Sequence, residues 1–319
     1  MMWTGWAQRA LRLTAVLFMV LLLTQAMTLL IPGDLAVMIL GENASLEALA
    51  QLRKELALDQ PLLDRFLQWL GAALEGDLGV SLQTGQPVAQ LIAERFLVSF
   101  ELMFYATALA LILALLVSVL AVSRVGTWLD RFCSFIALGL ISIPGFSLGL
   151  FLILFFALVL DWFPATGYRL WSEGVVAHLS TLFLPALALA LVEAPVYFRI
   201  LRTDMGETLK RPFVMTARAK GVPKWGVLIR HVLRPSLVTL ITVIGLNVGH
   251  LIGGAVIIET LFALPGMGRL LVGAVYAKDL FLVQGIVLVV ALVYIIVNML
   301  VDALYLVLYP QARGVERQR

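Results

Sequence analysis

The sequence predicts an all-α, polytopic membrane protein with six transmembrane helices. Of its 319 residues, 61% are hydrophobic and only 13% are charged, and the mean hydropathy is +1.00. Soluble domains are nearer half apolar and a quarter charged, so this composition indicates an integral membrane protein. A hydrocarbon core of about 30 Å needs about 20 residues of apolar helix to cross it. Six runs meet this requirement, at residues 11–31, 99–122, 132–160, 179–201, 236–260 and 281–308.

The first apolar run has two interpretations. Arg9 and Arg12 precede it, as basic residues precede a secretory signal. No cleavage pattern of small residues follows the run, however, and five further spans do, so an uncleaved first helix is favoured. We therefore expect three regions: 1–98, the first span with an external helical region; 99–309, a five-helix core with a cytoplasmic loop at 203–235; and 310–319, a cytoplasmic tail.

The external region contains three predicted short helices. Leucines recur at helical spacing over 44–58, a second amphipathic pattern over 61–74 begins with a proline, and a third covers 87–96. Acidic residues outnumber basic ones there, which suits an external face. The region either caps the membrane helices or contacts the substrate or a partner protein.

The placement of Lys and Arg sets the predicted orientation. With the N-terminus inside, 16 of the 23 basic residues fall on the cytoplasmic side. Short cytoplasmic loops of membrane proteins carry such an excess of basic residues. Both termini are therefore predicted to be cytoplasmic.

The only concentrated block of positive charge lies between the fourth and fifth predicted spans. Residues 210–235 hold seven basic residues and no acidic one. The seven are Lys210, Arg211, Arg218, Lys220, Lys224, Arg230 and Arg234. A solvated loop that follows the positive-inside pattern would explain these charges by itself, but not the order of the residues between them.

That order predicts two helices. Val214, Ala217 and Gly221 share one face of a short helix, and small residues on this face permit another surface to approach closely. Gly221 and Pro223 form a helix stop. A second helix over 224–233 then returns to the membrane, where Pro235 fits the first turn of the next span. We call the resulting helix–turn–helix the basic bracket (residues 210–235).

Motifs of a catalytic or cofactor site are missing from the sequence. There is no glycine-rich phosphate loop, since no Gly-Lys pair is followed by Ser or Thr. Cys133 is the single cysteine, and the three histidines are too dispersed to predict a metal site. The basic residues also lack the aromatic platform of a nucleic-acid binder. We expect no catalytic site, no bound cofactor or metal, and no nucleic-acid partner.

The basic bracket resembles the coupling motif of membrane subunits of ATP-binding cassette (ABC) importers. The segment Thr216-Ala217-Arg218-Ala219-Lys220-Gly221, with His231 and Arg234 after it, carries this resemblance. The dipeptide, oligopeptide and nickel permeases are the most similar group. Further motifs of that group occur in order at 32–34, 52–56, 58–61, 76–81, 265–270, 284–285 and 298–302. The chain departs from the pattern at Leu97, Ser99, Pro235, Thr239 and 309–311.

The resemblance implies a type I importer in the bacterial cytoplasmic membrane. Such an importer has a second, homologous permease subunit, two cytoplasmic ABC ATPases that bind ATP and Mg²⁺, and an external solute-binding protein. The bracket would insert into a groove of an ATPase. The residues it would use are Phe213, Thr216, Ala217, Arg218, Ala219, Lys220, Gly221, His231 and Arg234. Peptides are the favoured substrate, with nickel, metal-chelate or opine substrates as the alternative.

Polar residues within the spans are candidates for the translocation path, because ionisable groups are costly there. Glu193 either lines a water-filled path or pairs with Arg199. Asn247 and His250, at positions i and i+3, either face the path or form a hydrogen bond between helices. A proton-coupled transporter that relays protons through Glu193, His250 and Asp302 is a less favoured alternative. Such a transporter would not need the basic bracket.

Two further groups of residues have expected roles near the external side. Pro265, Gly266 and Gly268 predict a tight turn that belongs either to an external gate or to the surface for the binding protein. Glu101 and Glu259 are expected to fix helix packing.

Overall fold

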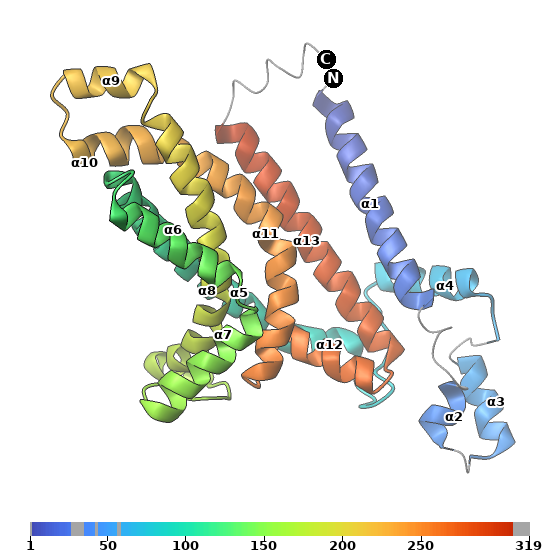
Figure 1. Ribbon diagram of the computed structural model, residues 1–319. Coiled ribbons are helices and arrows are strands. Elements are labelled where there is room, and N and C mark those ends of the chain that lie inside the picture. Colours follow the sequence, from blue (N-terminus) through green and yellow to red (C-terminus); the bar gives the residue numbers. More distant parts are fainter. Residues whose placement is uncertain (1, 27–34, 42–43, 56–58, 309–319) are drawn as a thin grey trace. The chain divides into compact units, whose positions relative to one another are not determined.

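The computed structural model describes residues 2–26, 35–41, 44–55 and 59–308 (Figure 1). Within these ranges the chain is helical, and strand pairing is limited to one isolated bridge between Val80 and Pro87. The predicted all-α class is therefore confirmed for the described residues. The chain divides into two compact units, Met1–Leu97 with Leu270–Ile295 and Val98–Arg269 with Ile296–Arg319. Each unit is described by itself.

The first unit begins with four helices among its described residues. They are α1 (Met2–Ala26), α2 (Leu35–Leu40), α3 (Leu46–Glu55) and α4 (Leu62–Leu74). Helix α4 lies across one end of α1 (Figure 1), and its Phe66 and Trp69 are buried in one cluster with Leu21 of α1. The patterns predicted at 44–58 and 61–74 correspond to α3 and α4, although residues 56–58 lie outside the described ranges.

The third predicted external helix is not a separate element. Residues 87–96 and the second predicted span form one helix, α5 (Val88–Ser123), of 36 residues. Its sequence contains neither glycine nor proline. Once a helix has formed, each further residue adds a hydrogen bond, so it continues until a residue stops it. The prediction of a break before residue 99 was wrong because no such residue is present.

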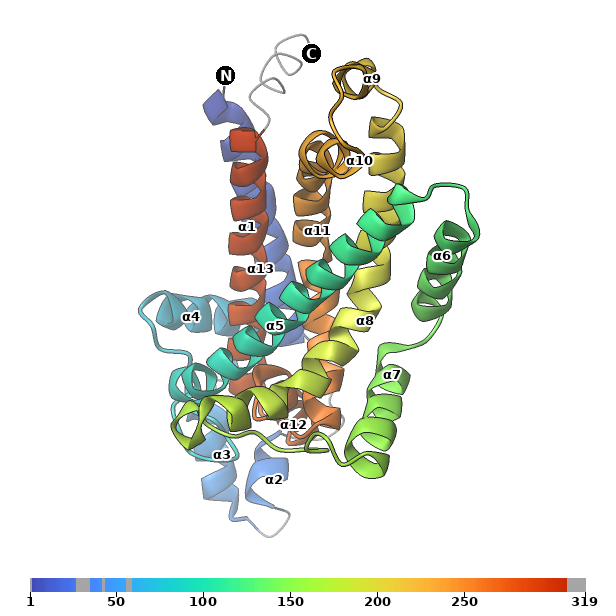
Figure 2. The same cartoon turned by 90° about the vertical axis from the view of Figure 1, so that its left-hand side faces the viewer.

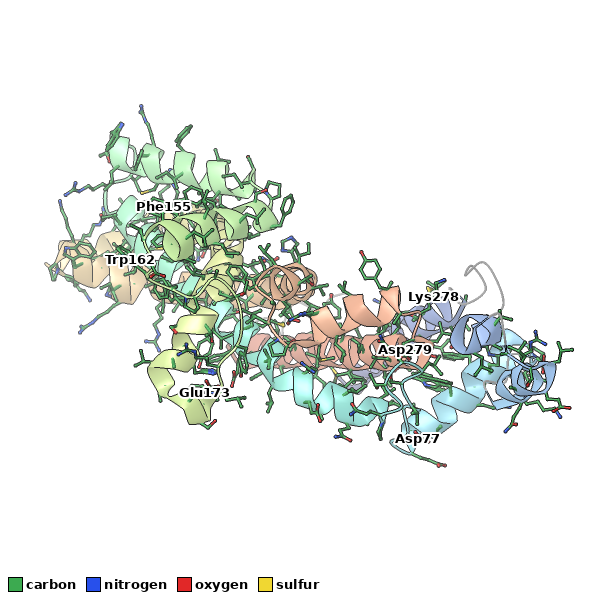
Figure 3. All side chains as sticks on the ribbon, turned by 90° about the horizontal axis from the view of Figure 1, so that it is seen from below. Asp77, Phe155, Trp162, Glu173, Lys278 and Asp279 are labelled. Atoms are coloured by element: carbon green, nitrogen blue, oxygen red, sulfur yellow. The ribbon has the colours of Figure 1, made fainter. Side chains whose placement is uncertain are left out.

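The loop between α4 and α5 is tied to the start of α13 (Leu280–Leu308). The buried carboxylate of Asp279 accepts hydrogen bonds from the Ser81 hydroxyl and from the backbone N–H of Leu282, the latter at 3.2 Å. Figure 3 labels Asp279 at this junction and Asp77 in the loop, where Asp77 accepts a hydrogen bond from the backbone N–H of Gly79 (2.8 Å). Asp279 thus caps α13 and holds the loop in place.

Two long helices, α8 (Val175–Thr208) and α11 (Arg234–Leu261), form the centre of the second unit. They pack along each other (Figures 1 and 2). The buried positions of α8 include many small residues, namely Ala186, Ala188, Ala190 and Ala194. Small side chains let helix backbones approach closely in a membrane, where the lipid is as apolar as the helices. Helices α5, α6 (Trp128–Ile141) and α7 (Gly145–Leu152) contribute to the same hydrophobic core.

The predicted span at 132–160 is bent sharply. Helix α6 ends at Ile141, and α7 with the π-helical segment η2 (Ile153–Val159) continues at an angle of 101°, and the change of direction is visible in Figure 1. Pro144 lies in the break. Proline cannot donate a backbone hydrogen bond and disfavours helical geometry in the residue before it. The prediction of one continuous helix here was wrong for that reason.

Four helices of the described chain are long and apolar enough to cross a membrane. They are Val88–Ser123, Val175–Thr208, Lys224–Leu261 and Leu280–Val301. The bent pair of α6 and α7 makes a fifth if it is counted as one span. The apolar part of α1, Arg12–Ala26, is shorter, and residues 27–31 of the first predicted span lie outside the described ranges. The protein is therefore a multi-pass membrane protein.

Candidate functional site

The basic bracket has the predicted helix stop. Helix α9 (Pro212–Ala219) begins with proline at its first position, where a missing N–H costs nothing. It ends before Gly221, which has a φ of +79°, a conformation that favours glycine. The backbone N–H of Val222 donates to the carbonyl of Ala217 (3.2 Å), as in a glycine-terminated helix. The stop at Gly221 and Pro223 is confirmed.

The return from the stop to the membrane is one continuous helix. It runs from Lys224 to Leu261 through α10 (Lys224–Gly226), the π-helical segment η4 (Val227–Leu233) and α11. Pro235 lies in the first turn of α11, as predicted, although η4 leads into α11 without a break. The wider turns of η4 directly precede it. Proline lacks an N–H and crowds the preceding turn, and a π-helical turn is one known way to accommodate such a disturbance.

The inner face of α9 packs against the same chain. Val214 and Ala217 are buried in a cluster with Val227, Leu228 and Val232 of the returning helix. The small residues were predicted to admit another surface, and the structure shows that this surface is the chain's own η4. Figures 1 and 2 show α9 beside α10 at the end of α8 and α11. The bracket is therefore a packed unit with its own small core.

The outer face of the bracket combines basic and apolar side chains. Phe213, Met215 and Trp225 are exposed by 43%, 65% and 57%. Thr216, Arg218, Ala219, Lys220 and Gly221 are also exposed, as are Arg211, Lys224 and Arg230. Half-buried His231 and exposed Arg234 lie further along and line a hollow with Leu237. Met215 and Trp225 were not predicted as site residues, because Met215 lies off the face of Val214 and Ala217 and Trp225 lies on α10.

An ion pair ties the end of α8, just before the bracket, to α6. Arg202 donates to both carboxylate oxygens of Asp130, at 2.6 and 2.7 Å. The backbone N–H of Gly126 also donates to Asp130 (3.0 Å). Such a bidentate contact fixes the relative orientation of the two side chains as well as their distance. The partners are 72 residues apart in the sequence, so the pair was not predicted.

Glu193, Asn247 and His250, the three residues proposed for the path, lie together. The side chain of Glu193 is 3% exposed, and its carboxylate accepts from Nδ2 of Asn247 (3.0 Å) and contacts Nδ1 of His250 (2.9 Å). Buried Tyr197, one turn along α8, also interacts with Glu193. The structure therefore shows a bond between α8 and α11 in place of the alternative ion pair of Glu193 with Arg199. His250 nevertheless stays exposed by 70%.

A second buried carboxylate, Glu259, holds the predicted tight turn. It accepts hydrogen bonds from the Ser99 hydroxyl (2.6 Å) and from the backbone N–H groups of Gly268 (2.7 Å) and Arg269 (3.1 Å). Ser99 in turn accepts from the N–H of Met267 (2.8 Å). These N–H groups belong to the first turn of α12 (Met267–Tyr276), where a negative charge is favoured. The predicted turn and the packing role of Glu259 are confirmed.

The packing of this turn also explains why residues 266 and 268 are glycines. A Cβ atom at Gly266 would overlap the carboxyl group of Glu259, and one at Gly268 would lie 2.5 Å from the Cα atom of Val256. Pro265 is half-buried, and its neighbours in the sequence, Leu264 and Gly266, are buried. The glycines are therefore required by close packing around Glu259.

Glu101 anchors the loop between α7 and α8. It accepts hydrogen bonds from Nε1 of Trp171 (2.8 Å) and from the hydroxyl of Tyr168 (3.1 Å). His178, fully buried and stacked on Trp171, lies 3.3 Å from Glu101. Burial and the nearby carboxylate raise the pKa of Tyr168 to about 12. Figure 3 labels Trp162 and Glu173 near the two ends of this loop. The packing role expected for Glu101 fits these contacts.

Two features bear on catalysis and metal binding. Within the described residues, no group of three or more His, Cys, Asp or Glu side chains could hold a metal ion. The prediction that the sequence lacks every catalytic motif was wrong, because residues 145–149 have the Gly-x-Ser-x-Gly spacing of hydrolase nucleophiles, with Ser147 at the centre. In hydrolases this serine sits on a sharp turn between a strand and a helix, whereas Ser147 lies inside α7. The spacing here does not build a nucleophile.

These features define the membrane subunit of a transporter: long apolar helices, polar groups within them, and an exposed basic bracket. The chain belongs to the family described as the binding-protein-dependent transport system inner membrane component, which matches residues 106–314. The N-terminal component of the same systems matches residues 2–103. The resemblance to ABC importer permeases drawn from the sequence is therefore confirmed.

Individual relatives agree with this family. The chain is 39% identical over 306 residues to a putative peptide transport system permease protein of Brucella abortus (strain 2308), covering 96% of this chain and 98% of the relative. It is 35% identical to the glutathione transport system permease protein GsiC of Escherichia coli (strain K12), covering 96% and 97%. A chain of the MetNI methionine ABC transporter, solved in inward-facing conformations, shares the fold with a TM-score of 0.54 at 20% identity, covering 68% of this chain and 95% of that one.

Proposed function

We propose that this chain is a permease subunit of an ATP-driven importer that carries peptides into a bacterial cell across the cytoplasmic membrane. With a second, homologous permease it forms the translocation path. Two cytoplasmic ABC ATPases bind ATP and Mg²⁺ and hydrolyse the ATP, and an external binding protein delivers the substrate. The chain itself binds no cofactor and catalyses no reaction. Relatives named as peptide and glutathione transport permeases support peptides over the alternative of nickel, metal-chelate or opine substrates.

The basic bracket is the observation that carries this proposal. Its exposed face offers three large apolar side chains, Phe213, Met215 and Trp225, surrounded by basic groups. Apolar anchors with a charged rim are the composition of a protein–protein interface. We assign this face to an ATPase, with Phe213, Thr216, Arg218, Ala219, Lys220 and Gly221 on it and His231 and Arg234 at its edge. Ala217 is buried and contributes to the core of the bracket instead.

The packing of the bracket provides a route for coupling. Because Val214 and Ala217 are packed on η4, and η4 continues into α11, a push on α9 moves α11 with it. Arg202 and Asp130 join the end of α8 to α6. A movement of the ATPases would therefore shift a packed group of helices, as alternating access requires.

The remaining topology follows from the charge distribution. We propose six spans, of which α1 is the first, with both termini and the bracket in the cytoplasm. The turn at Pro265, Gly266 and Gly268 then lies at the external end of α11 and forms part of the external gate. The cluster of Glu193, Asn247 and His250 lies near the middle of the predicted spans 179–201 and 236–260 and lines the path.

A proton-coupled transporter is the second candidate, because Glu193 and His250 of its predicted relay do lie together. The side chain of Asp302, the third member, lies outside the described part of the chain. Uptake of a labelled tripeptide by the reconstituted complex separates the two. We expect uptake that requires ATP and the ATPase subunits, stops with vanadate and continues with a protonophore. Uptake that persists without the ATPases would overturn the proposal.

A further inference from the structure

The exposed face of α11 carries a polar ring, His250, where that of α5 is apolar. On α5, the exposed residues Phe104, Ile112 and Leu116 are bulky and apolar, as lipid contact requires. On α11, the exposed residues near the middle of the span are Gly249, His250 and Gly253, flanked by the exposed apolar side chains of Leu246 and Ile257. Hydrocarbon offers a polar ring no hydrogen-bond partner, so a side chain such as His250 faces protein or water at this depth.

The contact with Glu193 fixes how His250 presents its ring. A carboxylate can only accept hydrogen bonds, so in the tautomer that pairs with it Nδ1 of His250 carries the hydrogen of the 2.9 Å contact. In the neutral ring, Nε2 is then left as an acceptor. The carboxylate is buried and Asn247 holds its second oxygen, so the ring is anchored at one end while 70% of the side chain stays accessible.

We propose that His250 contacts the substrate halfway along the translocation path, with its Nε2 accepting a hydrogen bond from the amino terminus of a passing peptide. Glu193 acts as a positioning residue that holds the ring. The inference rests on the proposed function, because it assumes a peptide path along α11. A carboxylate behind the ring favours a cationic ammonium group over a second carboxylate as the ligand.

A cysteine near His250 can report whether a peptide reaches this depth. Gly253 lies one turn along the same face, and an added Cβ atom there would have no neighbour within 4 Å. The complete complex is reconstituted with Cys133→Ser and Gly253→Cys, and labelling by the membrane-impermeant thiol reagent MTSET is followed. Leu116→Cys on the apolar face of α5, where Leu116 is 65% exposed, is the matched control.

We expect Gly253→Cys to be labelled at least tenfold faster than Leu116→Cys. Trialanine should slow this labelling, and N-acetyl-trialanine, which lacks the ammonium group, should slow it much less. Equal labelling at the two positions would overturn the proposal, because α11 would then face lipid or a sealed interface. Equal protection by the two peptides would overturn the role of the amino terminus.

Substitutions then assign the contact to His250. His250→Phe should remove the protection by trialanine and lower kcat/KM for its uptake about tenfold, the effect of losing one hydrogen bond to a charged group. His250→Gln keeps a donor and an acceptor and should restore most of both. Glu193→Gln alone should reduce the protection by trialanine. When it is combined with His250→Phe, it should cause no further loss of protection. Full protection in His250→Phe would contradict the proposal.

The same experiments distinguish this inference from the proposed function. If the wild-type complex shows no ATP-dependent uptake of trialanine or of any other peptide, the proposed function fails. If the wild type takes up peptide and His250→Phe behaves like it, only the inference about His250 fails.

Discussion

Glu193 and Glu259 are both buried carboxylates of the second unit, yet their surroundings differ in kind. Glu259 is bound by two backbone N–H groups and by the buried Ser99 hydroxyl. Glu193 is bound by side chains, one of which is the exposed His250. A carboxylate enclosed by backbone donors fixes the fold, whereas a carboxylate that holds an exposed side chain positions a group for contact with something else. Burial alone therefore does not assign a role to a charged residue within a membrane protein.

The largest effect on stability is expected for Glu259→Ala. It leaves the N–H groups of Gly268 and Arg269 and the hydroxyl of Ser99 without their acceptor. Each unpaired buried donor costs about 1–3 kcal/mol, so we expect a loss of about 3 kcal/mol or more. Thermal unfolding of the purified complex in detergent measures this loss. Glu259→Gln, which keeps one acceptor oxygen, should lose less stability. An unfolding temperature of Glu259→Ala equal to that of the wild type would contradict the difference between the two carboxylates.

The next largest effect is expected for Gly268→Ala. The added methyl group would lie 2.5 Å from the Cα atom of Val256, so the turn must shift. Overpacking of this kind costs about 1–3 kcal/mol. Gly253→Ala is the control, because its methyl group meets open space. If the two variants unfold at the same temperature, the turn around Glu259 is not rigid.

A smaller effect on stability is expected for Glu193→Ala. His250 is largely exposed and Asn247 is half-buried, so both can find water when the carboxylate is removed, and buried Tyr197 keeps its contact with Asn247. We expect a loss of about 1 kcal/mol, the usual value for one hydrogen bond. Peptide uptake should nevertheless fall more than in Glu259→Gln when both are normalised to assembled complex. A stability loss as large as that of Glu259→Ala would remove the distinction between the two carboxylates.

The smallest effect on stability, within about 0.5 kcal/mol, is expected for Arg218→Glu, because Arg218 is exposed on the bracket. ATP-dependent uptake and co-purification of the ATPases should fall, since the charge on the proposed docking face is reversed. Arg124→Glu changes another exposed basic residue, which lies outside the bracket, and serves as the control. Normal uptake by Arg218→Glu would count against the docking face.

Predictions based on neighbouring residues were largely correct. The stop at Gly221 and Pro223, helices α3 and α4 and the turn at residues 265–268 all follow from local backbone preferences. Two local predictions were wrong although the signal was present. Pro144 marks the break between α6 and α7, and the lack of glycine and proline in residues 88–123 explains the length of α5.

Partners distant in the sequence could not be predicted. Ser99 and Glu259 are 160 residues apart, and Asp130 and Arg202 are 72 apart. A single sequence carries no signal for which polar residues of different spans will meet, because each is equally costly in the membrane until it is paired. The sequence did identify Glu193, Asn247 and His250 as candidates, but only the structure shows that they share one contact.

By itself, the sequence determined that this protein is a helical membrane protein of the importer permease family with a basic helix–turn–helix. Hydropathy, charge placement and helix stops are local properties, so they can be read along the chain. Only the tertiary structure decided which face of the bracket is free, since Val214 and Ala217 are covered by η4. It also decided which buried carboxylate supports the fold and which presents a side chain, because hydrogen-bond partners are set by the packing of helices.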